Sequence, residues 1–211
     1  MLNRIRRLLS PDRPPADPLE RLLAPIRKLR PGQIAIDCGA NVGNVTAVMA
    51  ATGATVHAFE PNPAAFAVLS ARVAELPNVK AYQAAVAASA GTVRLYRHIR
   101  AQEDAVYWSV GSSTIVEKNN IDHAAFDDVP AVDLAEFIGR LGRPVDLLKM
   151  DIEGAEVALL NHLIDMEIVT SIGIILVETH EDKIPHLREP TELLRRTIAE
   201  RGLDNIRLDW I

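Results

Sequence analysis

The sequence is short of cysteine, of aromatic residues and of long apolar runs, and these shortages exclude several classes of protein. Cys38 is the only cysteine among 211 residues, so neither an intramolecular disulfide nor a cysteine-based zinc site is expected. No apolar run approaches the roughly 18 residues of a membrane span. A Pro-rich stretch follows the basic segment Met1–Leu9 where a signal peptide would have its apolar core. We therefore expect a cytoplasmic protein without a membrane span.

An excess of basic charge is also missing. Lys and Arg number 23 against 28 for Asp and Glu, which gives a net charge of −5. Proteins that bind nucleic acids carry a basic surface, so we expect a small-molecule substrate and no nucleic acid partner. The length and the 48% of hydrophobic residues suit one domain with a sizeable core, and a homodimer is one possible assembly.

The chain divides into a short N-terminal part and one main domain. Residues 1–30 are predicted to be a helical segment with a Pro-rich linker, including a helix over Leu19–Leu29 that Pro25 interrupts. Residues 31–211 alternate apolar strands with helices. Because the strands are continuous apolar runs, the pattern predicts a parallel α/β sheet that helices bury on both faces. The strongest strands are Ile34–Ile36, Ala54–Phe59, Val145–Met150 and Ile172–Val177.

Polar residues follow each of these strands. The carboxyl ends of parallel strands meet at one edge of a sheet, where ligands bind. Four loops are therefore expected to form the site, namely Asp37–Gly43, Glu60–Asn62, Asp151–Glu153 and Glu178–Glu181.

The first of these loops favours a cationic cofactor. Its glycines, Gly39 and Gly43, let the backbone turn sharply and approach a ligand. It lacks the G-x-G-x-x-G pattern of nicotinamide sites, since Asn stands at positions 41 and 44. Asp37 would repel a pyrophosphate and attract a sulfonium, which favours S-adenosyl-L-methionine (SAM) over NAD. Glu60, at the end of the next strand, can accept both ribose hydroxyls of a nucleoside.

Three motifs in order carry a resemblance to a known family. IAIDCGANVGNVTAVMAATGATVHAFEPNP, DLLKMDIEGAE (Asp146–Glu156) and ILVETHE (Ile175–Glu181) resemble the FkbM-type SAM-dependent methyltransferases. The resemblance implies a Rossmann-like, mostly parallel sheet and an enzyme that often methylates hydroxyl oxygens of sugars or secondary metabolites. It also implies that Gly39, Asn41 and Gly43 line the methionine end of SAM, Glu60 the ribose, and Ala85 and Val86 the adenine. Such enzymes usually end in two antiparallel strands, whereas only Ile206–Trp210 follows the last helix here, so this edge is expected to be shortened.

Methyl transfer to a hydroxyl is helped by a base, and the loops after Val145–Met150 and Ile172–Val177 provide candidates. We expect His180 and Asp151 to be catalytic, because a histidine takes a proton at neutral pH and Asp151 can orient the hydroxyl. Glu153 and Glu178 are expected on the acceptor side, with Glu153 also bracing the helix that follows. These groups could ligate Mg²⁺, but their spacing does not place them around one point, and no metal is expected.

The stretch from Arg97 to Pro130 lacks periodicity, which is typical of a binding loop. We expect it to recognise the acceptor through Trp108 and Ser112, the alternative being a loop whose aromatic residues fill a local core.

Two alternatives remain open. An N-methyltransferase is less consistent, because D/N-P-P-Y/F is absent after the strand Val145–Met150. A non-catalytic SAM-binding scaffold would keep Gly39, Gly43 and Glu60 without needing Asp151 or His180.

Overall fold

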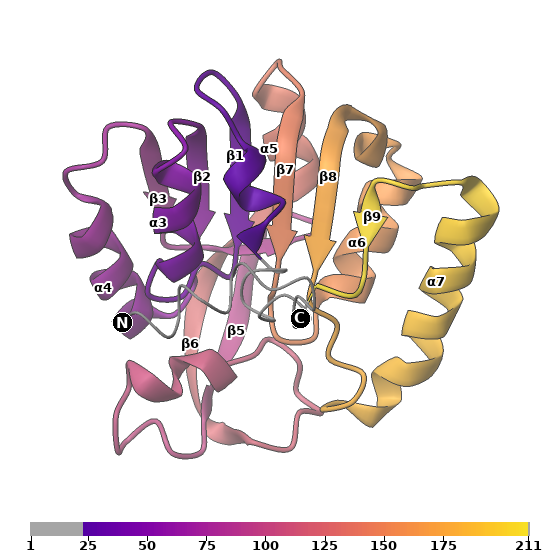
Figure 1. Ribbon diagram of the computed structural model, residues 1–211. Coiled ribbons are helices and arrows are strands. Elements are labelled where there is room, and N and C mark those ends of the chain that lie inside the picture. Colours follow the sequence, from indigo (N-terminus) through magenta and orange to yellow (C-terminus); the bar gives the residue numbers. More distant parts are fainter. Residues whose placement is uncertain (1–22, 211) are drawn as a thin grey trace, which may run out of the picture.

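The computed structural model describes residues 23–210, and its centre is a six-stranded parallel sheet (Figure 1). The strand order is β3-β2-β1-β7-β8-β9. The bounds are β1 Ile34–Cys38, β2 Thr55–Phe59, β3 Val79–Tyr82, β7 Val145–Met150, β8 Ile172–Val177 and β9 Ile206–Arg207. The predicted Rossmann-like, mostly parallel sheet is confirmed.

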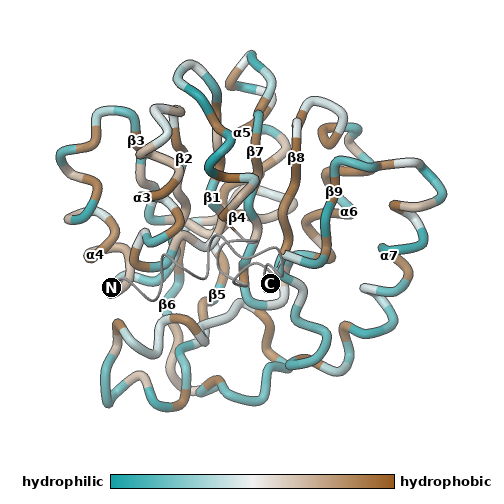
Figure 2. The backbone as a smooth tube through the Cα atoms, in the orientation of Figure 1, coloured by the Kyte–Doolittle hydropathy of each residue, from teal (hydrophilic) through white to brown (hydrophobic). Residues whose placement is uncertain are grey.

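Helices cover both faces of this sheet. Successive side chains of a strand point to opposite faces, so neighbouring residues pack against different helices. From β1, Ile34, Ile36 and Cys38 pack in one apolar core, whereas Ala35 packs in another. The first core holds α5 (Leu134–Arg140), α6 (Glu156–Asp165), the 3₁₀ helix η4 (Ile168–Ser171) and α7 (Arg188–Arg201). The opposite face carries α3 (Asn44–Ala50) and α4 (Pro63–Val73). Figure 2 shows that the central strand β8 is apolar, whereas the outer helix α7 carries many hydrophilic residues.

Side-chain caps fix where two of the helices begin. Asn62 Oδ1 accepts hydrogen bonds from the N–H groups of Ala64 and Ala65, which starts α4. Asp133 Oδ1 accepts from the Glu136 N–H and starts α5 in the same way. Asn and Asp are among the residues that favour this position.

A smaller three-stranded sheet lies beyond the carboxyl ends of the main strands (Figure 1). It has the order β4-β6-β5, with bounds β4 Ala85–Ala87, β5 Gly91–His98 and β6 Ile121–Asp133. β6 corrects the prediction of an irregular loop between Arg97 and Pro130. Its side chains are mostly half-buried or exposed. Its sequence therefore lacks the regular alternation of apolar and polar residues that indicates a strand. Residues between β5 and β6 form the loop that reaches the site, with the 3₁₀ helix η3 (Tyr107–Gly111) inside it.

The two ends of the described chain differ from expectation. Of the helix predicted over Leu19–Leu29, residues 23–29 contain one 3₁₀ turn, η2 (Ile26–Lys28), which follows Pro25. The rest of that helix, the segment Met1–Leu9 and the Pro-rich linker fall outside the described residues. At the other end the 3₁₀ turn η5 (Pro185–Leu187) precedes α7, and the two-residue β9 pairs parallel to β8. The edge of the sheet is therefore shortened as predicted, but it is parallel and not antiparallel.

Within residues 23–210, no helix combines the length and the apolar character that crossing a membrane requires.

Candidate functional site

The loop after β1 lies directly against the loop after β7. Gly39 has a φ of +74°, and a Cβ there would lie 1.7 Å from the carbonyl oxygen of Asp151, so this position requires glycine. The Asp151 N–H donates to the Cys38 carbonyl oxygen at 3.1 Å. The predicted cofactor loop and the predicted catalytic loop thus form one wall.

Glu60 is fixed at the end of β2 by the backbone. The Asn41 N–H donates to Oε2 and the Asn62 N–H donates to Oε1, each at 2.8 Å. Burial raises the pKa of Glu60 to about 7, against the opposing effect of these two hydrogen bonds. Each oxygen of the carboxylate keeps a further lone pair, which can accept a hydrogen bond from a ligand.

A cavity of about 100 Å³ lies among these loops. Phe59, Ala84 and Leu95 contribute apolar parts of its wall. Most of the residues predicted for the site also lie on this wall, namely Gly39, Asn41, Glu60, Ala85, Val86, Ser112, Asp151 and Glu153.

Asp37 does not lie on this wall, which corrects its predicted contact with the cofactor. It is fully buried on the α3 side of the sheet, with Oδ1 3.1 Å from Lys149 Nζ. Its Oδ2 accepts a hydrogen bond from Thr46 Oγ1 at 2.7 Å. Burial alone would lower the pKa of Lys149, but the charges of Asp37 and Asp151 and the hydrogen bond to Asp37 together outweigh burial and raise it. The carboxylate of Asp37 is therefore committed to Lys149 and Thr46.

Gly43 is also away from the cavity. It precedes α3 with a φ of +82°, and a Cβ there would lie 2.7 Å from Leu69 Cδ1 on α4. Its predicted cofactor contact is replaced by close packing between the two helices.

Four carboxylates surround His180, whose side chain is fully buried. Its Nε2 lies 3.5 Å from Glu153 Oε2, 3.7 Å from Glu178 Oε1 and 3.8 Å from Asp151 Oδ1. Its Nδ1 lies 3.1 Å from Glu156 Oε1. Burial lowers the pKa of His180, but Glu156 and the other acids outweigh burial, and the net result is a raised pKa.

This arrangement corrects the prediction that His180 meets the acceptor directly. The imidazole is not on the cavity wall, whereas Asp151 and Glu153 are. Glu178 is half-buried and accepts a hydrogen bond from Lys183 Nζ at 3.2 Å. Burial and the charge of Asp151 raise the pKa of Glu178. Of the four acids around His180, Asp151 and Glu153 are therefore the two that border the cavity.

The loop between β5 and β6 closes the cavity from the other side. Ser109, in η3, accepts a hydrogen bond from Asn41 Nδ2 at 2.9 Å. Ser112 accepts one from Asn62 Nδ2 at 3.1 Å. Both serines are buried. Ser112 thus joins the β5–β6 loop to the loop after β2.

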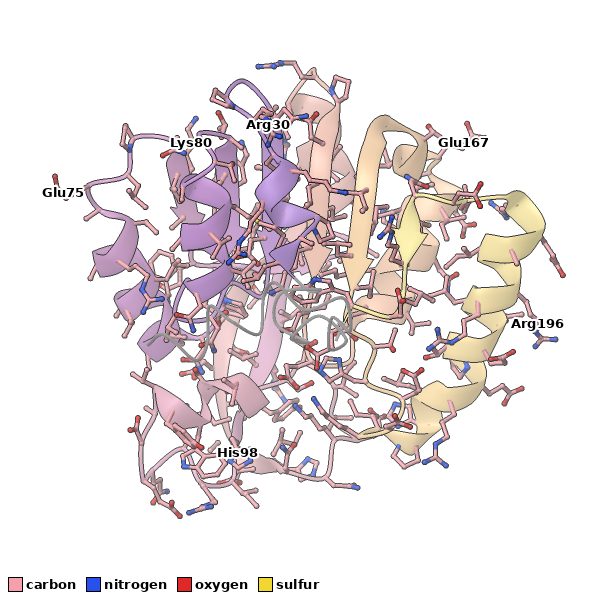
Figure 3. The ribbon with its side chains drawn as sticks, viewed as in Figure 1. Arg30, Glu75, Lys80, His98, Glu167 and Arg196 are labelled. Carbon is pink, nitrogen blue, oxygen red and sulfur yellow. The ribbon has the colours of Figure 1, made fainter. Side chains whose placement is uncertain are left out.

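Trp108 faces a second cavity, of about 400 Å³. Its ring stacks on His98 with the centroids 4.4 Å apart, and Figure 3 places His98 at the end of the molecule opposite Arg30, Lys80 and Glu167. Lys118, Asn119, Asn120 and Lys183 also line this cavity. Glu153 and Val110 line both cavities, so the acidic residues lie between the two.

Two site residues were missed by the sequence analysis. Lys118 is buried and donates to Glu153 Oε2 at 2.5 Å and to the Gly111 carbonyl oxygen at 3.0 Å. Its neighbours in the sequence are mostly polar, so the sequence does not indicate that Lys118 is buried. Glu156 is also buried and accepts from the N–H groups of Ile152 and Gly154. Its signal was available, because an acid at the start of a helix often binds free backbone N–H groups.

Comparison with known proteins identifies the family to which the chain belongs. A model of the methyltransferase FkbM domain matches residues 37–203. The chain belongs to the FkbM methyltransferase family. The enzyme class predicted from the sequence, a SAM-dependent methyltransferase, is thereby confirmed.

The solved structures that resemble this FkbM methyltransferase are distant from it. An rRNA methylase from Streptococcus thermophilus is 12% identical, with 86% of this chain and 79% of that chain covered and a TM-score of 0.49. A precorrin 8w decarboxylase from Methanobacterium thermoautotrophicum is 16% identical, with 86% and 73% covered and a TM-score of 0.45. No curated protein matches the chain.

The residues of this FkbM methyltransferase fit the nucleoside part of SAM. Glu60 offers two fixed acceptor oxygens, and Phe59, Ala85 and Val86 form an apolar wall beside it. The cavity of about 100 Å³ is smaller than the ligand pockets of roughly 300 Å³ or more that small molecules occupy. A molecule as large as SAM therefore needs more room than this cavity offers.

Proposed function

We propose that this FkbM methyltransferase transfers the methyl group of SAM to a hydroxyl oxygen of a small molecule. The observation that carries the proposal is the position of Asp151 and Glu153, whose carboxylates border the cofactor cavity. An aliphatic hydroxyl is a poor nucleophile until a base takes its proton, and a carboxylate at this position can serve as that base.

The cofactor side of the proposal uses the loops after β1 and β2 and two residues of β4. Glu60 accepts the ribose hydroxyls, Gly39 and Asn41 border the methionine end, and Ala85 and Val86 face the adenine. When bound, SAM supplies a methyl carbon that its positively charged sulfur makes electrophilic. The protein aligns the two reactants and excludes water from them.

The acceptor side uses the second cavity. A ring can occupy the second cavity, whose wall includes Trp108, while its hydroxyl reaches the acids, because Glu153 borders both cavities. Asp151 takes the proton of the hydroxyl. Lys149 and His180, which lie 3.8 Å from its two oxygens, hold the carboxylate in place and are positioning residues.

Nitrogen is a weaker candidate for the accepting atom. The loop after β7 reads Asp151-Ile152-Glu153, without the proline-containing signature of many exocyclic-amine methyltransferases. The net charge of −5 also disfavours a nucleic acid acceptor.

The test combines binding with turnover. Calorimetry measures the affinity for S-adenosylhomocysteine (SAH), and transfer of a labelled methyl group from SAM is followed over a panel of sugars, other alcohols and amines. We expect wild type to methylate a hydroxylated acceptor. Asp151→Asn should reduce turnover by about 10²- to 10⁴-fold and leave the SAH affinity unchanged, whereas Asp204→Asn, at an exposed position, should change neither.

Two results would overturn the proposal. Transfer to amines alone would assign the chain to N-methylation. Tight SAH binding without transfer to any acceptor in the panel would favour the non-catalytic scaffold.

A further inference from the structure

Asp151, Glu178 and His180 bring one ligand atom each to a common point. These atoms all lie within 4.8 Å of one another, and two of the residues follow the adjacent strands β7 and β8. Small divalent cations bind their ligands at about 2.1 Å, which places neighbouring ligands about 3 Å apart. The distances of 3.7 Å and 3.8 Å from His180 Nε2 to the two carboxylates thus need only a small contraction.

The imidazole of His180 is oriented as that of a metal ligand. Its Nδ1 faces Glu156 Oε1 at 3.1 Å, and metal-binding histidines commonly donate their other ring N–H to a carboxylate. The residue is 1% exposed, and among residues 23–210 neither ring nitrogen has a partner in hydrogen-bond geometry, so Nε2 is free to bind a ligand. A lone pair on Nε2 would face the acidic oxygens, and that contact is unfavourable unless a proton or a metal cation lies between them.

The charges around the imidazole point to the same cation. The connected network contains five carboxylates, namely Asp37, Asp151, Glu153, Glu156 and Glu178, and three ammonium groups, namely Lys118, Lys149 and Lys183. With the neutral imidazole that a metal ligand requires, two negative charges are therefore in excess. Buried charges of one sign are costly without a counter-charge, and a divalent cation would balance these two.

We propose that Asp151, Glu178 and His180 bind a divalent metal ion of the Mn²⁺ or Mg²⁺ type. Two carboxylates and one imidazole suit such a cation, and Glu153 Oε2, 3.5 Å from Nε2, is within reach as a fourth ligand. The ion takes Asp151 Oδ1, the oxygen that faces His180, and leaves Oδ2 for the acceptor. The proposal that the ion binds rests only on the positions of these residues. Only the role of the ion, which would make a coordinated hydroxyl more acidic, rests on the proposed function.

The experiment is a titration of chelator-treated full-length protein with Mn²⁺, in which electron paramagnetic resonance measures the free ion. We expect about one ion per chain. Glu178→Gln should weaken binding by at least about tenfold, and it should abolish the rise in melting temperature that Mn²⁺ gives to wild type. Glu178 suits this test because it is only half-buried, so the substitution should leave the fold intact. Glu181→Gln removes a neighbouring carboxylate that pairs with Arg195, and it should bind Mn²⁺ as wild type does.

Wild type without Mn²⁺ binding at millimolar concentration would overturn the proposal, and so would equal affinity in wild type and Glu178→Gln. Neither result depends on methyl transfer. A protein that binds Mn²⁺ in this pattern but methylates nothing would keep the metal site and refute the proposed function instead.

Discussion

The affinity of this FkbM methyltransferase for SAH should rise as the pH increases through neutrality. Burial raises the pKa of Glu60 to about 7, so the carboxyl is mainly protonated at about pH 6 and mainly ionised at about pH 8. Both oxygens already accept a backbone N–H. Only the ionised form keeps enough lone pairs to accept two ribose hydroxyls as well.

The size of the effect follows from the fraction that is ionised. One unit below its pKa a carboxyl is about one-tenth ionised, so the affinity should differ about tenfold between pH 6 and pH 8, which equals about 1.4 kcal/mol. Glu60→Gln cannot titrate, so its affinity should be flat over the same range. It should also be lower than that of ionised wild type by about 1–3 kcal/mol, the usual cost of an unmatched buried partner.

The same pKa acts in the opposite direction on folding. The folded-state pKa of Glu60 is raised from its ordinary value of 4.5 to about 7, so folding favours the protonated form. Its contribution to stability is fully present below about pH 4.5 and is lost as the pH rises through about 7, by about 3 kcal/mol in total. The difference in unfolding free energy between wild type and Glu60→Gln should follow this curve.

Isothermal titration calorimetry of SAH at constant ionic strength is the assay, with urea unfolding at the same pH values. Glu75→Gln, at the exposed position labelled in Figure 3, is the matched control and should keep the pH profile of wild type. A flat profile in wild type would falsify the assignment of Glu60 to the ribose. An equal slope in Glu60→Gln would attribute the pH dependence to another group.

Three further substitutions test the framework of the site. Gly39→Ala should destabilise the fold by more than about 3 kcal/mol in urea unfolding, because the added methyl group would overlap the carbonyl oxygen of Asp151. The control Gly142→Ala should cost only about 1 kcal/mol, because Gly142 also has a positive φ, +62°, but has open space around it. Lys149→Met should cost about 3–5 kcal/mol by leaving Asp37 buried without its counter-charge, and adding Asp37→Asn should restore part of that loss. Ser109→Ala removes one bond that closes the cavity, worth about 1 kcal/mol, so stopped-flow fluorescence should show SAH associating up to about fivefold faster, and an unchanged rate would show that the loop does not limit entry.

The main sheet could be predicted because its strands are buried on both faces. Ile172–Val177 is a continuous apolar run and Val145–Met150 is apolar at four of its six positions, and the structure gives strands with those same bounds. β6 could not be predicted, because its exposed positions carry both polar and apolar side chains. Its partner β5 also shifts register between Tyr96 and Arg97, which disturbs any regular alternation.

The sequence located the site but did not distinguish its wall from its support. Asp37 is the next-to-last residue of β1, and Glu60 directly follows β2. Asp37 is buried in an ion pair with Lys149, whereas Glu60 borders the cavity. A strand end fixes the position of the backbone, whereas the side-chain direction depends on which face of the sheet the residue occupies. For His180, the three carboxylates in front of it come from the loops after two different strands, so no local pattern indicates its burial.

These contacts also determine which part of the site can move. Lys149 Nζ donates to the carbonyl oxygens of Cys38 and Gly39, pairs with Asp37 and lies 3.8 Å from Asp151. One buried ammonium thereby joins the loop after β1 to the loop after β7, and neither loop can shift without disturbing a buried charge. Around Ser109 and Ser112 the β5–β6 loop meets the same wall through two side-chain hydrogen bonds, each worth about 1 kcal/mol. Further along, Ser113 and the buried Lys118 tie the same loop to Glu153. Opening of the cavity should therefore occur by outward movement of the part around Ser109 and Ser112, while the cofactor loop and the acids keep their relative positions.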